Sequence, residues 1–278
     1  MIETCFNGRA IIKLLMLTVL CASAVSAQKS DRKLVFADEF NGASGSSIDS
    51  TKWTMQTGGN GWGNKELQFY TDSRENAYLD GKGRLVIKTI MQDLPLSYKC
   101  WYGQCKYTSA RLMTKNKFDQ KYGRFEARIK IPRGIGMWPA FWMLGNDIDK
   151  VHWPRCGEID IMENIGREPS TVHGTIHGPG YSGANGIGAP YALLKNKVLA
   201  DDFHVYSTVW TEDQINFYVD AHLYKTVTPK DLPGQWVYDH PFFMILNVAV
   251  GGNWGGTPDD ATVFPQTMIV DYVRVYNE

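Results

Sequence analysis

Alternating apolar and polar residues mark several short strands along the chain. In the run Arg124–Ile131, which reads RFEARIKI, Phe125, Ala127 and Ile129 fall on one face and the charged residues on the other. This period of two is that of a half-buried β-strand. Similar runs, which we also expect to be strands, are Leu85–Ile87, His204–Trp210, Ile215–Asp220 and Val270–Tyr276.

One further run, Phe242–Val250, is apolar on both faces and predicts a central strand of a packed sandwich. Clusters of Gly, Pro, Asn and Asp separate the runs and predict loops at Thr57–Asn64, Gly178–Pro190 and Gly251–Asp260. Almost nothing after Ala27 has a helical period. Many short strands with turn signals between them predict an all-β sandwich or barrel in a single domain.

The N-terminal segment has the pattern of a secretory signal peptide. Arg9 and Lys13 precede the apolar run Leu14–Val25, and small residues occupy the −3 and −1 positions of a cleavage point after Ala27. The run is shorter than the ~20 apolar residues that a membrane span needs, although a membrane anchor or a short buried helix is the alternative. We therefore expect residues 1–27 to be removed and the mature chain, 28–278, to be secreted to the periplasm or the medium, with no membrane association after cleavage.

Composition narrows the class of partner. The 278 residues are 44% hydrophobic and 21% charged, with 29 basic and 29 acidic side chains. This is an ordinary globular composition, and zero net charge argues against nucleic acid and favours a neutral ligand. Among the cysteines of the mature chain, Cys100 and Cys105 can close a small loop in an oxidising compartment, which leaves Cys156 over.

Three acidic residues stand close together in the segment Cys156–Asn164, CGEIDIMEN. Glu158 and Asp160 are two apart, so a strand points both to the same face. Glu163 follows Glu158 by an odd offset and reaches that face only if a β-bulge absorbs one residue. Three acids on one face repel each other, so the segment is either a solvated acidic face, a cation site or a catalytic site.

Glycoside hydrolysis is a chemistry that needs such a cluster. A retaining glycosidase uses two carboxyls ~5–5.5 Å apart, one as nucleophile and one as general acid/base. A like charge and apolar surroundings raise the pKa of one carboxyl and keep it protonated near neutral pH. A third acid between them can hold a shared proton and orient the nucleophile.

Tryptophans near these acids favour a sugar ligand. Trp138 and Trp142, in MWPAFWML, are four apart and share a face of an extended segment, where they either stack on sugar rings or pack in the core. Trp62 and Trp254 lie in glycine-rich loops, where a groove wall explains them better than core packing. Neither glycine-rich stretch matches a phosphate-binding loop or a dinucleotide motif.

Together these segments resemble a known family. The motifs GWGNKELQFYT, YTSARL, WPAFWML, GEIDIMEN, HGPGYSG, PFFMILNVAVGGNW and VDYVRVY occur in this order between Val35 and Tyr276. They resemble glycoside hydrolase family 16, and most of all its bacterial-type endo-1,3-β-glucanases (laminarinases). The resemblance implies a β-jelly-roll sandwich of two antiparallel sheets, concanavalin-like, with a β-glucan lying in a cleft along the concave sheet, and one catalytic domain over 28–278.

The resemblance also implies roles for individual residues. Glu158 would be the nucleophile, Asp160 the assisting acid and Glu163 the general acid/base, in a double displacement that retains the anomeric configuration. The additional residue Met162 is typical of the same branch of the family. The positions implied to bind substrate are Asn64, Glu66, Arg111, Trp138, Trp142, His177 and Trp254.

Catalysis of this kind needs no cofactor, but the resemblance implies a structural calcium ion. Its ligands would be Glu39, the carbonyl of Gly83 and Asp271, on the convex side, where the ion would join the first and last strands. His173 and His177 have the spacing of a zinc motif, but their segment is rich in glycine and β-branched residues and lacks the HExxH glutamate, so we predict no zinc site.

The predicted activity is therefore endo-hydrolysis of β-1,3 glucans such as laminarin, with mixed-linkage 1,3-1,4 glucans as a second candidate substrate. We expect the enzyme to be secreted and monomeric. A glucan-binding recognition protein is the first alternative, although family-16-like binding proteins have lost the acids and all three are present here. A related transglycosylase or a galactan hydrolase is the other alternative.

Overall fold

The structure is a computed structural model that describes residues 1–2, 32–194 and 197–277. The expected signal peptide lies, apart from its first two residues, outside the described residues. The strands belong to one compact unit, Arg32–Glu278. Within the described part of the chain, no helix combines the length and the apolar character needed to cross a membrane.

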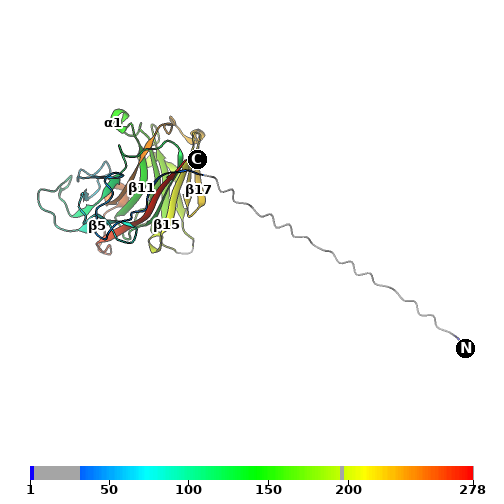
Figure 1. Cartoon of the computed structure of the whole chain (residues 1–278), viewed down its shortest axis with the longest axis horizontal. Coiled ribbons are helices and arrows are strands. Elements are labelled where there is room, and N and C mark those ends of the chain that lie inside the picture. The colour runs from blue at the N-terminus through cyan, green and yellow to red at the C-terminus, as the bar shows by residue number, and fades with distance from the viewer. Residues whose placement is uncertain (3–31, 195–196, 278) are drawn as a thin grey trace. The chain divides into compact units, whose positions relative to one another are not determined.

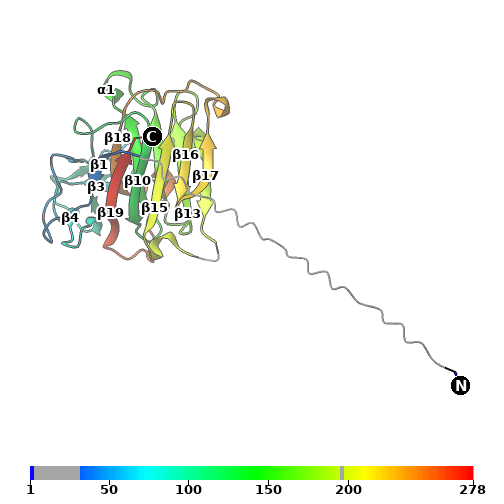
Figure 2. The same ribbon diagram turned by 45° about the vertical axis from the view of Figure 1, so that its right-hand side comes forward.

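Two sheets stacked face to face form this unit (Figure 1). The seven-stranded sheet has the order β14 (Ile187–Ala192), β13 (Thr171–His177), β12 (Glu158–Glu163), β11 (Met137–Gly145), β18 (Phe242–Val250), β9 (Arg111–Met113) and β2 (Thr54–Gln56). The ten-stranded sheet has the order β17 (His222–Val227), β16 (Ile215–Val219), β15 (His204–Trp210), β10 (Gly123–Lys130), β19 (Gln266–Tyr276), β5 (Leu85–Met91), β8 (Tyr107–Ser109) and β3 (Gln68–Tyr70), with β1 (Leu34–Asp38) on β19 and β4 (Ala77–Leu79) on β5. Figure 2 shows β19, β10, β15, β16 and β17 side by side in one layer.

The remaining described elements are short. They are the hairpin β6 (Lys99–Cys100) and β7 (Gly103–Gln104), the helices α1 (Ile148–Val151) and α2 (Gly252–Gly255), and the 3₁₀ turns η1 (Gly183–Asn185), η2 (Leu199–Asp201) and η3 (Pro229–Asp231). Every pairing between described strands is antiparallel except that of β3 with β8. The expectation of an all-β sandwich with little helix is confirmed.

Strand β10 shows how the alternation in the sequence becomes two faces. Phe125, Ala127 and Ile129 are fully buried in the core between the sheets. Arg124 and Glu126 point away from that core and form an ion pair of 2.7 Å. Burying apolar side chains on one face while the other keeps its polar partners stabilises this sandwich arrangement.

The expected central strand, β18, is buried along its whole length. Alternate residues such as Met244 and Leu246 join the main core between the sheets. Phe243 and Ile245 pack on the opposite face, in a smaller cluster with Leu144 and Cys156. Both faces of the strand are therefore covered, as its apolar sequence predicts.

One expected loop is wrong in part. The glycine- and proline-containing segment Gly178–Pro190 ends in strand β14, which pairs with β13 from Ile187 onward. Glycine at 188 allows this, because a Cβ there would lie 2.1 Å from the carbonyl oxygen of Gly174 on β13. The pairing of an edge strand therefore overrides the turn signal of its composition.

Candidate active site

The three acids of β12 lie on the outer face of the seven-stranded sheet. Opposite β11, Phe141 pairs with Met162 and Trp142 pairs with Asp160, so the pairing passes over Ile161. This β-bulge lets Ile161 and Met162, although consecutive, both enter the core. The expected bulge is confirmed, and it returns Glu163 to the face of Glu158 and Asp160.

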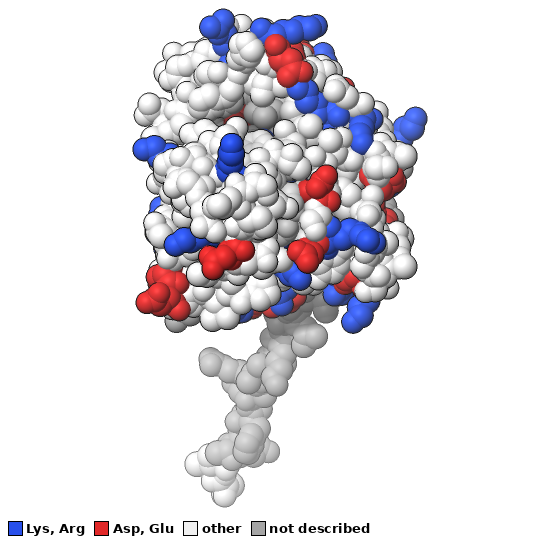
Figure 3. All heavy atoms as spheres, turned by 90° about the vertical axis from the view of Figure 1, so that its left-hand side faces the viewer, with Lys and Arg blue, Asp and Glu red and all other residues white. Residues whose placement is uncertain are grey.

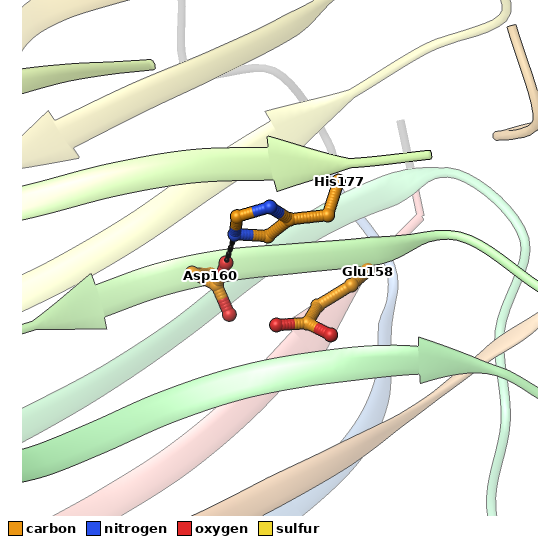
Figure 4. Close-up of side chains that lie close together, drawn as sticks. All are labelled: Glu158, Asp160 and His177. Atoms are coloured by element: carbon orange, nitrogen blue, oxygen red, sulfur yellow. Dashed lines mark ion pairs between the residues drawn. The ribbon is translucent and has the colours of Figure 1, made fainter. Parts of the chain in front are cut away.

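Each acid has a neighbour that acts on its charge. The indole N–H of Trp153 donates to Glu158 Oε2 at 2.7 Å, and that of Trp138 donates to Glu163 Oε1 at 2.9 Å. His177, on β13, places Nε2 3.1 Å from Asp160 Oδ2, and Figure 4 shows Glu158, Asp160 and His177 close together.

Burial raises the pKa of all three carboxyls. Burial and the charge of Asp160 raise the pKa of Glu158 to about 8, while nearby His177 opposes the rise. Burial raises the pKa of Glu163 to about 7, against the hydrogen bond from Trp138. Burial and the charge of Glu163 hold the pKa of Asp160 well above its usual range. The cluster therefore retains protons near neutral pH, as an acid catalyst requires.

A cation–aromatic stack lies beside the acids. The guanidinium of Arg111, on β9, lies 4.8 Å from the ring of Trp62 and 4.6 Å from that of Trp142. Its Nε donates to Gln56 Oε1 at 2.6 Å. Trp142 also donates its N–H to Asn247 Oδ1 at 2.7 Å. Two indoles are thus held in fixed orientations on the same side of the sheet as the acids.

Glu66 anchors the glycine-rich loop on this face. Its carboxylate accepts from Gln68 Nε2 at 2.6 Å, from the hydroxyl of Tyr70 at 3.2 Å and from Asn64 Nδ2 at 3.4 Å. Asn247 donates in turn to the Tyr70 hydroxyl at 3.1 Å. Glu66 is only 5% exposed, so its buried carboxylate holds the loop in place through these hydrogen bonds. Burial raises its pKa, and its charge adds to the rise at Glu163.

Trp254, in the second glycine-rich loop, packs against Trp138, the residue that binds Glu163. Its ring lies edge-on to that of Trp138, 5.4 Å away, and 4.9 Å from the imidazole of His173. The imidazole of His173 is bound to Glu168 at 2.9 Å. All the residues expected from the sequence to bind substrate therefore lie in one connected region with the three acids.

Some residues of this region, among them Trp153 and Asn247, were not predicted from the sequence. Trp153 contacts Glu158 from the loop after α1, and nothing in its sequence position indicates this contact. Asn247 is the polar residue of the otherwise apolar run FFMILNVAV on β18, and this break in the pattern is a signal that could have found it.

A metal ion could also use part of this region. Glu158, Asp160 and His177 each offer a ligand atom, and these atoms lie within 4.8 Å of one another. Their raised carboxyl pKa values mean that an ion there would have to displace protons.

The residues expected to bind calcium lie elsewhere, at the junction of the first and last strands. The Glu39 carboxylate accepts two hydrogen bonds from Arg274, at 2.8 and 2.9 Å. Asp271 pairs with Arg128 at 2.8 Å and lies 3.8 Å from Arg84. These carboxylates fit the oxygen preference of calcium, but arginines already balance their charge.

Gly83 lies against oxygens of the same region. A Cβ at this position would be 3.6 Å from the carbonyl oxygen of Glu39 and 3.4 Å from Asn41 Oδ1. Neutral oxygens of this kind are also calcium ligands, and the arginines do not occupy them.

The three cysteines of the expected mature chain form one disulfide and leave one free thiol. Cys100 and Cys105 form a disulfide, and Cys156 is free and buried. Burial raises the pKa of the Cys156 thiol to about 12. A thiol of that pKa is unreactive at neutral pH, so Cys156 is a packing residue of the small cluster with Leu144, Phe243 and Ile245.

The sandwich with its protonated carboxyl cluster flanked by indoles defines the chain as a glycoside hydrolase. The profile of "Glycosyl hydrolases family 16" matches residues 49–274. The chain belongs to glycosyl hydrolases family 16.

Named relatives extend over most of the chain. The "Glucan endo-1,3-beta-glucosidase A1" of Niallia circulans is 41% identical over 88% of this chain, which spans only 38% of that relative's length. The "Beta-glucanase" of Rhodothermus marinus is 40% identical, and the match covers 94% of this chain and 92% of that relative. The solved laminarinase catalytic domain of Thermotoga maritima is 47% identical, with a TM-score of 0.82 over 90% of this chain and 99% of that domain.

Proposed function

We propose that this chain is a retaining endo-1,3-β-glucanase of the laminarinase type. The observation that carries the proposal is the row of three acids on β12, in which Asp160 is buried and separate indole N–H groups bind the half-buried Glu158 and Glu163. The names of the relatives support β-1,3 glucan as the substrate. Two carboxyls in different environments are the requirement of a double displacement.

In the first step Glu163 acts as the acid. Its proton passes to the glycosidic oxygen while a carboxylate oxygen of Glu158 attacks the anomeric carbon. The bond from that carbon to the leaving chain breaks, and a glycosyl ester on Glu158 forms. The N–H of Trp153 stabilises the attacking carboxylate, and Asp160 takes up the proton that it shares with Glu158.

In the second step water takes the place of the leaving chain. The Glu163 carboxylate removes a proton from water, whose oxygen attacks the anomeric carbon. Glu158 leaves as a carboxylate and shares the proton held by Asp160 again, and Glu163 is protonated again. Two inversions retain the β-configuration.

The aromatic groups around the acids suit a neutral glucan. Trp142 and Trp62 flank Arg111 beside the acids, and Trp254 lies on the side of Glu163. Indole faces stack on the apolar faces of sugar rings. On the face shown in Figure 3, basic and acidic side chains are interspersed among uncharged ones, which also suits an uncharged polymer. Mixed-linkage 1,3-1,4 glucan is the second substrate that we propose.

We also propose that the protein is secreted, acts as a monomer and forms one catalytic domain over 28–278. The signal-type N-terminus supports secretion, and the Cys100–Cys105 disulfide suits an oxidising compartment. No cofactor takes part in the chemistry, because the carboxyls supply both the nucleophile and the proton.

The test is product release from laminarin, with lichenan, cellulose, xyloglucan and agarose alongside and the first-formed anomer followed by NMR. We expect laminarin to yield several oligosaccharides at once, with the β-anomer first. A first-formed α-anomer would rule out the double displacement, and cleavage of agarose instead would make the chain a galactan hydrolase.

Variants assign the roles. Glu158→Gln and Glu163→Gln should each lower kcat by at least ~10³-fold, since each removes a group that reacts directly. Asp160→Asn should lower it less. The control is Glu126→Gln, which changes a glutamate of the other sheet that pairs with Arg124. Full activity in either of the first two variants would contradict the assignment.

A further inference from the structure

The segment 92–106 carries a small hairpin that lies outside the two main sheets. Its strands β6 and β7 pair Lys99 with Gln104 and Cys100 with Gly103. The Cys100–Cys105 disulfide closes the hairpin at its base. Trp101 stands at the tip of this turn.

Hydrogen bonds dock the hairpin onto the glycine-rich loop of the active site. The backbone N–H of Trp101 donates to the Gly59 carbonyl at 2.8 Å, and its indole N–H donates to the Glu66 carbonyl at 2.7 Å. The hydroxyl of Tyr102 donates to the Leu67 carbonyl at 2.6 Å. The hairpin is therefore held by the same loop that carries Trp62.

The glycines of that loop make this docking possible. A Cβ at Gly59 would lie 2.7 Å from Cys100 Sγ and 2.9 Å from the Lys99 carbonyl oxygen. A Cβ at Gly61 would lie 2.8 Å from Cδ1 of Trp101. Gly59 and Gly61 belong to no phosphate-binding motif. Glycine is needed at both positions because the hairpin approaches the loop too closely for a side chain.

Trp101 is nevertheless 49% exposed. Its N–H is satisfied and its backbone is fixed, so its ring is held in one orientation, while about half of the residue remains in water. A fold gains little from leaving a large indole exposed in this way. An ordered, exposed indole is suited to binding, because little side-chain freedom is lost when a ligand covers it.

Trp101 lies beside residues expected to bind substrate. Glu66, whose carbonyl oxygen accepts from the indole N–H, also accepts from Asn64 through its carboxylate. The ring of Trp101 packs on Gly61, next to Trp62, which stacks on Arg111 of the site. Trp101 is therefore held against the same glycine-rich loop that carries Trp62 and Asn64.

We propose that Trp101 forms an additional sugar-binding site, at the outer end of the cleft, for a β-glucan chain whose cleavage point lies at Glu158 and Glu163. The proposal rests on the proposed glucanase function. A chain long enough to reach the hairpin gains the Trp101 contact, whereas a short oligosaccharide bound at the acids does not. The disulfide and the docking bonds hold the indole in place before the chain arrives.

The test compares long laminarin with short laminari-oligosaccharides on Trp101→Ala, Trp101→Phe and the wild type. An aromatic contact of this kind corresponds to roughly a 3- to 10-fold change in binding. For Trp101→Ala we expect the KM for long laminarin to rise by about that factor while kcat on it changes little. The KM for the short substrates should rise much less. Trp101→Phe keeps a ring without the N–H and should recover part of the affinity.

Controls separate the possible failures. Leu223→Ala removes an exposed apolar side chain, 46% exposed, from edge strand β17 of the other sheet and should match the wild type on both substrates. A KM that rises equally on short and long substrates would mean that Trp101 only supports the loop of Asn64 and Glu66, and an unchanged KM on long laminarin would mean that it binds no sugar. Either result overturns the inference. A wild type inactive on every β-1,3 substrate would instead overturn the proposed function.

Discussion

At the scale of single residues, two indole N–H groups tune the two glutamates that we propose as catalytic. Both glutamates are partly shielded from water, and burial alone would push their pKa values higher still. A hydrogen bond donated to a carboxylate favours the charged form and lowers its pKa. Trp138 and Trp153 therefore act on the chemistry through the protonation of their partners, in addition to any contact with a sugar.

Trp138→Phe tests this effect at Glu163. Phenylalanine keeps a ring but loses the N–H, so the pKa of Glu163 should rise above its value of about 7. Because Glu163 must be protonated to act as the acid, the alkaline limb of the kcat/KM profile should move to higher pH, by roughly 1 unit.

The matched control is Trp142→Phe on the same strand. The N–H of Trp142 binds Asn247 and touches no acid. This variant should weaken glucan binding while its alkaline limb stays in place. An alkaline limb that does not move in Trp138→Phe, or moves to lower pH, would contradict the assignment of the proton to Glu163.

At the scale of the element, strand β12 combines core packing with an unfavourable row of acids. Its apolar residues Ile159, Ile161 and Met162 are buried between the sheets. Its acids occupy the opposite face, where their charges repel and lose hydration. The strand is therefore stabilised from one side and destabilised from the other, as expected where function constrains a sequence.

The protonation of Glu158 makes this cost depend on pH. Its pKa rises from an ordinary 4.5 to about 8 on folding, so the folded chain holds the proton more tightly than the unfolded chain. The resulting stabilisation is complete below pH 4.5 and is lost as the pH rises through 8.

Glu158→Gln removes the charge that must be buried at high pH. At pH 9 we expect its Tm to exceed that of the wild type by roughly 2–4 °C, the change that ~1 kcal/mol produces in a domain of this size. At pH 4 the two proteins should unfold at nearly the same temperature, and calorimetry at both pH values measures the difference. Equal Tm values at pH 9 would show that Glu158 ionises in the fold without cost.

For the molecule as a whole, the first and last strands of the unit Arg32–Glu278 meet in the ten-stranded sheet. Strand β1 pairs with β19, and Arg274 of β19 binds Glu39 just after β1. We propose, from the family resemblance, that a structural calcium ion strengthens this junction through Glu39, Gly83 and Asp271. The arginines that pair with both carboxylates would have to share them with the ion.

Removal of metal tests the calcium proposal. EDTA should lower the Tm of the wild type and added Ca²⁺ should restore it, while activity of the folded protein well below the Tm stays the same, because the junction is separate from the acids. Asp271→Asn should lower the Tm and abolish its response to Ca²⁺. A wild-type Tm that is identical in EDTA and Ca²⁺ would show that the arginines alone balance this cluster.

The class of fold and the shared face of Glu158 and Asp160 follow from the spacing of residues along the chain. The period of two in Arg124–Ile131 and the apolar run Phe242–Val250 each became the expected strand, because side-chain burial decides which face of a strand points inward. The odd spacing of Glu158 and Glu163 required a bulge for the two to share a face, and the register of β12 on β11 contains that bulge.

Which side chains meet depends on how the strands and loops pack against one another. Three contacts join segments from different elements. Trp153 binds Glu158, Asn247 lies between Trp142 and Tyr70, and the hairpin of Trp101 docks on the glycine-rich loop. The arginines on the expected calcium carboxylates are contacts of the same kind. Periodicity reports which face of its own strand a residue occupies, whereas the partner on that face depends on strand order, register and loop docking, which are set when the whole sandwich packs.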